Sequence, residues 1–321
     1  MGSYAAWLTW FKHFQFPNHP PDFGVAWFGA RAMLHGENPY SLVGPGLAYE
    51  WPWALQYPAT AFVATMPLSF LPELHAAMVF VFLTTVAFAF GLTADGWYRM
   101  PLFFTTSFVA AAAFAQWSIL FCAGIVVPAI ALLFASKPNL ALATLAAEAG
   151  PTPSSRPARV STLAIIGGSA LLAISLALLP QWPRYWMDAI GRSHQLVPPV
   201  LLPWGFVVLL ALLRWRRWEA RLILALAFVP QTTYWYEALP LFLIPRNLAE
   251  SILLALIAST GMLIEQYALS PTTEVEHYRQ IGTVMVLVIY LPATIMILRR
   301  PNTGERPVWL RFASRINTTG R

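Results

Sequence analysis

The sequence predicts an all-α, polytopic membrane protein with roughly seven to nine membrane segments, some of them short or re-entrant. Hydrophobic residues make up 58% of the 321 residues and charged residues only 11%, whereas soluble domains carry about 25% charged residues. The mean hydropathy is +0.58. The charged residues also cluster, so that the uncharged stretches 74–94 and 101–136 reach the length that a hydrocarbon core of about 30 Å requires.

The same composition argues against other classes of protein. The chain holds 14 Trp, and this much aromatic surface seeks burial or a membrane interface, so disorder is excluded. The net charge of +6 indicates topology and not a nucleic-acid partner, because six of the 20 cationic residues lie within residues 299–321. The single cysteine, Cys122, lies in an apolar run, where we expect it to serve packing.

The N-terminal region alternates short helices and an aromatic loop. Residues 1–21 are too short to span, so we expect an interfacial helix there. Residues 22–34 place apolar side chains at helical spacing, which predicts an amphipathic helix with Asp22 at its N-cap. Residues 35–58 are rich in Gly, Pro and aromatic residues and predict a loop at headgroup depth, and the apolar residues 59–71 are too few to cross unaided.

The rest of the chain contains the expected crossings. A stretch of 36 uncharged residues, 101–136, predicts a hairpin of two short helices turning near Gln116. Residues 251–264 predict a short helix, followed by a loop with Glu274 and Glu276. The predicted full crossings are residues 74–93, 160–179, 199–213 and 281–298.

The distribution of arginine predicts the orientation, because cytoplasmic segments carry the excess of cationic residues. The basic tail, the cluster 214–221, the linker 156–159 and Arg99 should share the cytoplasmic side. This orientation requires residues 222–245 to enter and return as two half-helices, which the prolines inside that segment permit. A single tilted span there would place the tail outside.

These segments divide the chain into three parts and predict a multi-pass protein of a bacterial inner membrane. We expect an external or interfacial region (residues 1–72), a transmembrane helical domain (residues 73–298) and a basic cytoplasmic tail (residues 299–321).

Within the first region, the segments PDFGVAWFGARAMLHGENPY, QYPA and MPLSFLP carry a resemblance to a known family. They resemble the first external loop of the GT-C type polyprenyl-phosphate-dependent membrane glycosyltransferases, in particular the GT87-like mannosyltransferase group. AQWSILF, the Lys-Pro pair at Lys137, PRYWMDAI and YWYEALPLFLIP extend the resemblance more weakly. The pattern differs at Ala59, at Ala115 and in the absence of a spanning helix before Asp22.

The resemblance implies a membrane enzyme that transfers a sugar, such as mannose, from a polyprenyl-phosphate donor to an acceptor on the outer face of the inner membrane. Asp22 matches the position of the proposed general base, which takes a proton from the acceptor hydroxyl. A carboxylate at the boundary of water and lipid is partly desolvated, which raises its proton affinity. The alternative is that Asp22 only caps the helix that follows it.

A departing lipid phosphate needs cationic help, and a sugar needs hydrogen bonds and stacking surfaces. The donor-binding candidates are Arg31, Arg184, Arg192 and His194. The substrate-lining candidates are Tyr40, Trp51, Tyr57, Gln116 and Glu237. The alternatives are that the cations anchor at the interface, that the aromatic residues form a membrane belt and that Gln116 bonds between helices. We expect Lys137 to cap a helix or meet lipid headgroups, and Glu237 to face a cavity.

Two other classes of function remain open at this point. If the expected missing helix leaves the lipid groove open, the chain is a non-catalytic subunit of a larger membrane complex. It would then bind a membrane-protein partner through the aromatic residues Trp7, Trp10, Phe11, Phe14 and Phe16. A start codon assigned too far downstream is the other explanation. A small-solute transporter is less favoured, because no paired half-repeats are visible. We expect membrane lipid as a partner, no nucleic acid, no metal and no cofactor.

Overall fold

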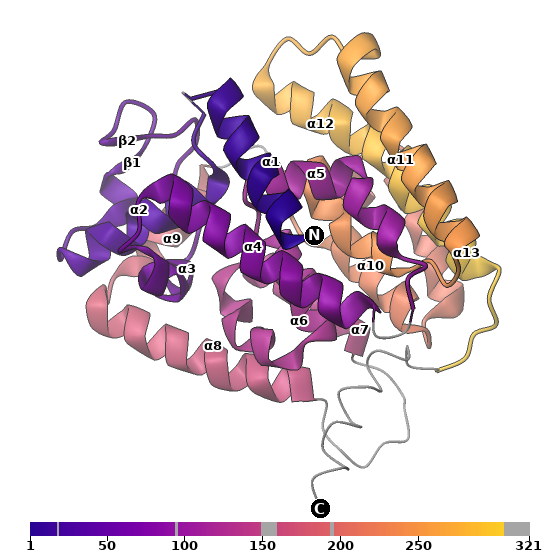
Figure 1. Cartoon of the computed structure of the whole chain (residues 1–321), viewed down its shortest axis with the longest axis horizontal. Helices are drawn as coiled ribbons and strands as arrows, with labels where there is room; N and C mark the ends of the chain where they lie inside the picture. Colours follow the sequence, from indigo (N-terminus) through magenta and orange to yellow (C-terminus); the bar gives the residue numbers. More distant parts are fainter. Residues whose placement is uncertain (18, 94–95, 149–158, 193–195, 305–321) are drawn as a thin grey trace, which may run out of the picture.

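The computed structural model describes residues 1–17, 19–93, 96–148, 159–192 and 196–304 (Figure 1). The chain folds almost entirely into helices, which confirms the all-α class. Two strands of two residues each, β1 (Val43–Gly44) and β2 (Tyr49–Glu50), pair in parallel, with Val43 opposite Tyr49.

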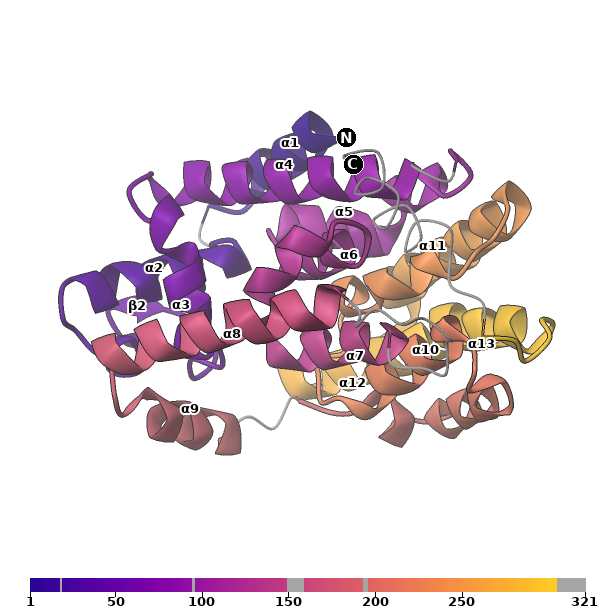
Figure 2. The same ribbon diagram turned by 90° about the horizontal axis from the view of Figure 1, so that it is seen from below.

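Short helices in the first part of the chain pack beside one long helix. These elements are α1 (Gly2–Gln15), α2 (Asp22–Leu34), η1 (Pro39–Ser41), α3 (Ala59–Thr65), η2 (Met66–Leu68) and α4 (Glu73–Leu92). Figure 2 shows α1 and α4 in the same outer layer. The two helices approach closely at Gly2, where a Cβ atom would lie 2.6 Å from a methyl carbon of Val86. The helix expected within residues 1–21 is therefore present, and one face of it is buried against the helical body.

A sharp bend dominates the middle of the chain. Its elements are η4 (Met100–Phe104), α5 (Thr106–Ala113), α6 (Ser118–Val126), η5 (Pro128–Ser136), α7 (Pro138–Glu148), α8 (Arg159–Leu178) and α9 (Trp182–Gly191). Helices α5 and α6 meet at 113°, and Ala115 between them has a φ of 51°. The predicted turn near Gln116 between two short helices is confirmed, but these helices cover only part of residues 101–136, with η4 before them and η5 after them.

The last part of the chain ends in a helix hairpin. It contains η6 (Pro199–Leu201), η7 (Gly205–Arg214), α10 (Trp218–Phe228), η8 (Trp235–Leu243), α11 (Leu248–Ala268), α12 (Glu274–Met285), the π-helical η9 (Val286–Tyr290) and α13 (Leu291–Leu298). The chain breaks at Pro230, between α10 and η8, whereas Pro240 lies inside η8. Every residue of η8 is buried.

Membrane-length helices run through this fold. Among the described residues, four helices are long and apolar enough to cross a bilayer: Glu73–Leu92, Val160–Leu178, Leu248–Ala268 and Glu274–Leu298. The bent pair of α5 and α6 could form one further broken span. Shorter apolar helices occur at Ala59–Leu68, Pro138–Ala147 and Gly205–Arg214. The chain is therefore a polytopic membrane protein with both long and short segments.

Three predicted segments differ from the structure. The crossing expected at residues 199–213 is wrong, because the chain turns at Trp204, with a φ of 64°, into two short helices. The short helix expected at 251–264 extends over the whole of α11, since Asn247 caps its first turn and Arg300 pairs with Glu250 in that turn. The expected loop with Glu274 and Glu276 is also wrong. Both residues lie in the first turn of α12, where a helix dipole favours acidic side chains.

The two ends of the long axis differ in character (Figure 2). Helices α2, α3 and α9 gather at one end, with β2. At the other end, the segments rich in arginine meet: Arg99 donates to the Pro245 carbonyl, Arg214 to the Arg300 carbonyl and Arg221 to the Ala146 carbonyl. The described parts of the basic segments thus share one end. Residues 156–158 of the linker and residues 305–321 of the tail lie outside the described residues.

Candidate functional site

Asp22 lies at the start of α2, in contact with the bend between α5 and α6. Its backbone N–H donates to the Phe114 carbonyl at 2.9 Å. The N-cap expected at Asp22 is wrong: Pro21 occupies that position, and Asp22 is the first helical residue. The Asp22 carboxylate instead accepts a hydrogen bond from Nε2 of Gln116. The half-buried carboxylate is therefore held by a side chain 94 residues away in the sequence.

The bend places Gln116 almost completely inside the protein, with 1% of the residue exposed. The left-handed conformation of Ala115 ends α5 and directs the chain into α6. Among the described residues, no hydrogen-bond partner lies near Oε1 of Gln116. Gln116 thus donates one hydrogen bond to Asp22 through Nε2 and keeps Oε1 as a buried acceptor atom.

A second pair of charges lies in the same interior region. Lys137, just before α7, contacts Glu237 of η8, with 2.8 Å between Nζ and Oε1. Glu237 is buried and Lys137 is largely so. Glu237, which was expected to face a cavity, therefore has an ion-pair partner. The expectation that Lys137 caps a helix or meets lipid headgroups is wrong. In the described part of the chain, no hydrogen-bond partner reaches Oε2 of Glu237.

Charges of both signs act on Asp22. Burial raises the pKa of its carboxyl to about 6, against the opposing effects of Lys137, Lys12 and the Gln116 hydrogen bond. Glu237 contributes a further upward shift of this pKa. Lys12 of α1 reaches this region over the ring of Phe114, with Nζ 4.9 Å from the ring centre, and donates to the Pro20 carbonyl at 3.3 Å. Asp22 is therefore ionised at neutral pH but protonated more easily than an ordinary aspartate.

Aromatic residues border these charges. Tyr57 lies near the ring of Trp117, with centroids 6.4 Å apart. Burial raises the pKa of Tyr57, and the negative charges of Asp22 and Glu237 raise it further. The Tyr40 hydroxyl donates a hydrogen bond to the Tyr57 carbonyl at 2.9 Å, which holds the backbone at Tyr57. Trp51 packs against the core, but no contact places it beside Asp22.

The arginines expected to bind the donor lie elsewhere. Arg31 is exposed on α2 and stacks on Trp27, 5.0 Å from the ring centre. Arg184 is exposed on α9, and Arg192 is exposed directly after its last residue, where it donates to the backbone carbonyl of Asp188 at 3.2 Å. His194 lies outside the described residues. The cations that act on Asp22 are Lys137 and Lys12 instead.

The sequence contains a signal for the Lys137–Glu237 ion pair, although the two residues were not predicted to be partners. Each interrupts an otherwise apolar stretch, and opposite charges inside a membrane domain are expected to pair. Lys12 offers no comparable signal, because a single lysine in a short aromatic helix is equally expected at a membrane interface.

An apolar groove lies between α3, η5, α8 and α9 and has a volume of about 460 Å³. Pro58 and Pro138 line it, and they directly follow Tyr57 and Lys137 in the chain. The tryptophans Trp182 and Trp186 form another part of its wall. The groove is therefore connected to the cluster through the chain, while Asp22 itself does not line it.

A separate charged cluster occupies the arginine-rich end. Glu219 is fully buried, and its Oε1 atom lies 3.0 Å from Arg217, 3.1 Å from Arg300 and 3.2 Å from Arg246. Arg300 also contacts Glu250 at 2.6 Å. The cluster joins the start of α10, the start of α11 and the end of α13.

Comparison with protein-family models, curated proteins and solved structures found no match. Within the described residues, no three His, Cys, Asp or Glu side chains are grouped as metal ligands. The absence of a metal and of a cofactor stays a prediction.

Proposed function

We propose that this protein is an integral-membrane glycosyltransferase that moves a sugar from a polyprenyl-phosphate donor to an acceptor hydroxyl, with Asp22 as general base. The observation that carries the proposal is the Asp22 carboxylate itself. It is half-buried, held by Gln116 and influenced by Lys137, Lys12 and Glu237, and burial raises its pKa to about 6. Perturbed carboxylates of this kind concentrate at functional sites.

The chemistry requires that Asp22 accept a proton as the acceptor oxygen attacks the anomeric carbon. The bond from that carbon to the donor phosphate breaks in the same step, with inversion, and the phosphate leaves with the bonding electron pair. A base with a pKa of about 6 is ionised above that pH, which suits proton abstraction near neutrality. The transfer rate should therefore rise with pH up to about 6 and level off above it.

The neighbouring groups fit the two substrates. Oε1 of Gln116 and Oε2 of Glu237 are buried acceptor atoms without a partner among the described residues. They would accept hydrogen bonds from sugar hydroxyls if the site opens to admit the substrate. Lys137, which is paired with Glu237 in this structure, would supply the positive charge that a departing phosphate needs, in place of the arginines expected from the sequence. The apolar groove beside Pro58 and Pro138 could hold the isoprenoid chain.

The polarity of the molecule supports a matching orientation. The arginine-rich end would face the cytoplasm of a bacterial inner membrane, and the end with α2, α3 and α9 would face outward. A reporter enzyme fused after Arg321 would report a cytoplasmic C-terminus, whereas periplasmic reporter activity would reject this orientation.

One observation favours a second function, that of a non-catalytic subunit. Helix α1 exposes aromatic side chains, among them Trp7 and Trp10, with 48% and 43% of each residue accessible. A membrane-protein partner could cover this face. Native mass spectrometry after gentle extraction separates the two functions: a fixed partner without turnover supports the subunit, and a monomer that transfers sugar supports the enzyme.

The direct test is the substitution Asp22→Asn, which keeps size and removes the base. Membranes that contain the full chain would receive labelled polyprenyl-phosphate mannose, and label would be followed into glycolipid or glycan. We expect a loss of transfer of about 10² to 10⁴-fold with normal insertion. The matched control is Asp188→Asn, which changes an exposed aspartate on α9 and should retain full transfer. Equal transfer in both variants rejects the proposal.

A further inference from the structure

A second apolar groove lies on the surface of the helical body, at the arginine-rich end. It has a volume of about 470 Å³ and runs between η4 and α11. Trp97, Pro101 and Phe104 line one wall, and Leu248, Ile252, Ala255 and Ser259 line the other. Phe104 and Leu248 are both at least half exposed, at 63% and 50%. This groove is separate from the Asp22 site.

The length of the groove matches one leaflet of a bilayer. Its α11 wall runs from Leu248 to Ser259, which spans about 16 Å at 1.5 Å per residue. Half of the hydrocarbon core is about 15 Å. A groove of this length suits one acyl chain that enters from the headgroup region and ends near the bilayer centre.

The shape of the groove suits a hydrocarbon chain. It is an open, apolar groove of about 470 Å³. The small side chains Ala255 and Ser259 lie on its α11 side. A single hydrocarbon chain can therefore lie along this wall.

Positive charge marks the headgroup end. Arg246 lies two residues before Leu248, and 38% of its side chain is exposed while it contacts Glu219 at 3.2 Å. Arg99 joins the two walls at this end by donating to the Pro245 carbonyl at 3.1 Å. Glu250, the acidic residue in the first turn of α11, is paired with Arg300. Trp97, with 73% exposed, has the amphipathic character of a residue at headgroup depth.

We propose that this groove binds an anionic phospholipid, with one acyl chain between η4 and α11 and the phosphate beside Arg246. The positive charge at one end of the groove fits a lipid phosphate, and the apolar groove, about one leaflet long, fits an acyl chain. The proposal does not depend on glycosyl transfer.

The test uses the full chain, purified in mild detergent, with native mass spectrometry and thermal unfolding as readouts. The probes are dioleoyl phosphatidylglycerol, dioleoyl phosphatidylcholine and glycerol phosphate without chains. We expect phosphatidylglycerol to remain bound and to raise the unfolding midpoint more than phosphatidylcholine does, and glycerol phosphate to have no effect. Equal effects of the two lipids, or an equal effect of glycerol phosphate, would overturn the proposal.

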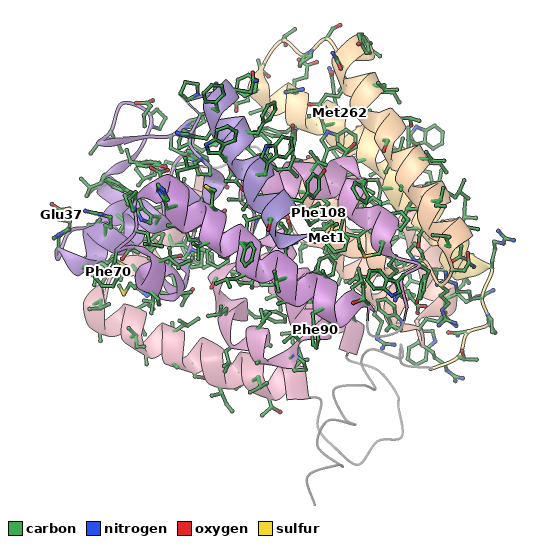
Figure 3. All side chains as sticks on the ribbon, in the orientation of Figure 1. Met1, Glu37, Phe70, Phe90, Phe108 and Met262 are labelled. Carbon is green, nitrogen blue, oxygen red and sulfur yellow. The ribbon has the colours of Figure 1, made fainter. Side chains whose placement is uncertain are left out.

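Variants then locate the site. Arg246→Gln should weaken phosphatidylglycerol binding about tenfold, since it removes one charge-assisted contact, and Ala255→Phe should block binding by filling the groove. The matched controls are Arg279→Gln, an exposed arginine on α12, and Met262→Phe on α11 beyond the groove (Figure 3). Retention of full affinity by both Arg246→Gln and Ala255→Phe, or an equal loss in the controls, would place the lipid elsewhere.

Discussion

The two buried acidic clusters of this protein differ in how completely they are paired. Glu219, at the arginine-rich end, has three arginines within 3.2 Å of one oxygen. Asp22 is half-buried and has a neutral amide as its hydrogen-bond donor, while the nearby Lys137 is already paired with Glu237. Burial of a charge costs free energy unless partners compensate for it. Glu219 is paired with three arginines through Oε1, although its Oε2 has no hydrogen-bond partner among the described residues. Asp22 has no direct cationic partner of this kind and keeps a raised pKa.

The largest effect on stability should come from the compensated cluster. Glu219→Ala leaves Arg217 buried without its carboxylate, so we expect a loss of about 3 to 5 kcal/mol in the free energy of unfolding. Chemical unfolding in detergent measures this loss. Arg216→Gln, which changes an exposed neighbour, is the control and should stay within about 0.5 kcal/mol of the wild type.

The next effect concerns the ion pair beside Asp22. Lys137→Met leaves Glu237 buried without its cation, and we expect a loss of about 3 kcal/mol. The double variant with Glu237→Gln should recover part of this stability, because the unpaired charge is gone. A double variant no more stable than Lys137→Met would show that the pair does not act as a unit.

A smaller effect follows from the amide that holds Asp22. The Gln116 hydrogen bond lowers the pKa of Asp22, so Gln116→Leu should raise this pKa and move the acidic limb of sugar transfer to higher pH by about half to one unit. The measurement is transfer against pH in membranes. A shift towards lower pH would contradict the assigned contact.

The smallest effect should come from the exposed arginines in and directly after α9. Arg184→Gln and Arg192→Gln remove side chains that face outward, so each should change the free energy of unfolding by less than about 0.5 kcal/mol and leave sugar transfer unchanged. A large loss of transfer in either variant would restore the sequence-based assignment of these arginines to donor binding.

The sequence predicted the features that depend on local composition. Long uncharged stretches predicted α4 and α8, and the 36-residue run ending at Ser136 predicted the bend at Gln116, because too many residues were present for one crossing. The start of α11 was missed, although Asn247 caps its first turn and the acidic Glu250 suits a helix N-terminus. The pairing of Glu250 with Arg300, 50 residues later, could not be predicted from the sequence.

The same limit applies to the candidate site. Asp22 and Gln116 were each identified from the sequence, but their contact depends on the angle between α5 and α6. The partner of Glu237 is Lys137, 100 residues earlier, and the charge pattern alone offered several cations. Composition predicts which residues are unusual, whereas tertiary packing decides which of them meet.

Asp22 is a half-buried carboxylate whose neighbours compensate for its charge only in part. The most direct test is its pKa, measured by infrared titration as the carboxyl band that disappears in Asp22→Asn. We expect a pKa of about 6. Because this value lies above the unfolded value, the stability that Asp22 contributes should fall as pH rises from about 4 to 6, and Asp22→Asn should unfold at the same or a higher temperature than the wild type at pH 7. A pKa below 4, together with a destabilised Asp22→Asn, would show that Asp22 is a fully paired structural carboxylate and would contradict this account.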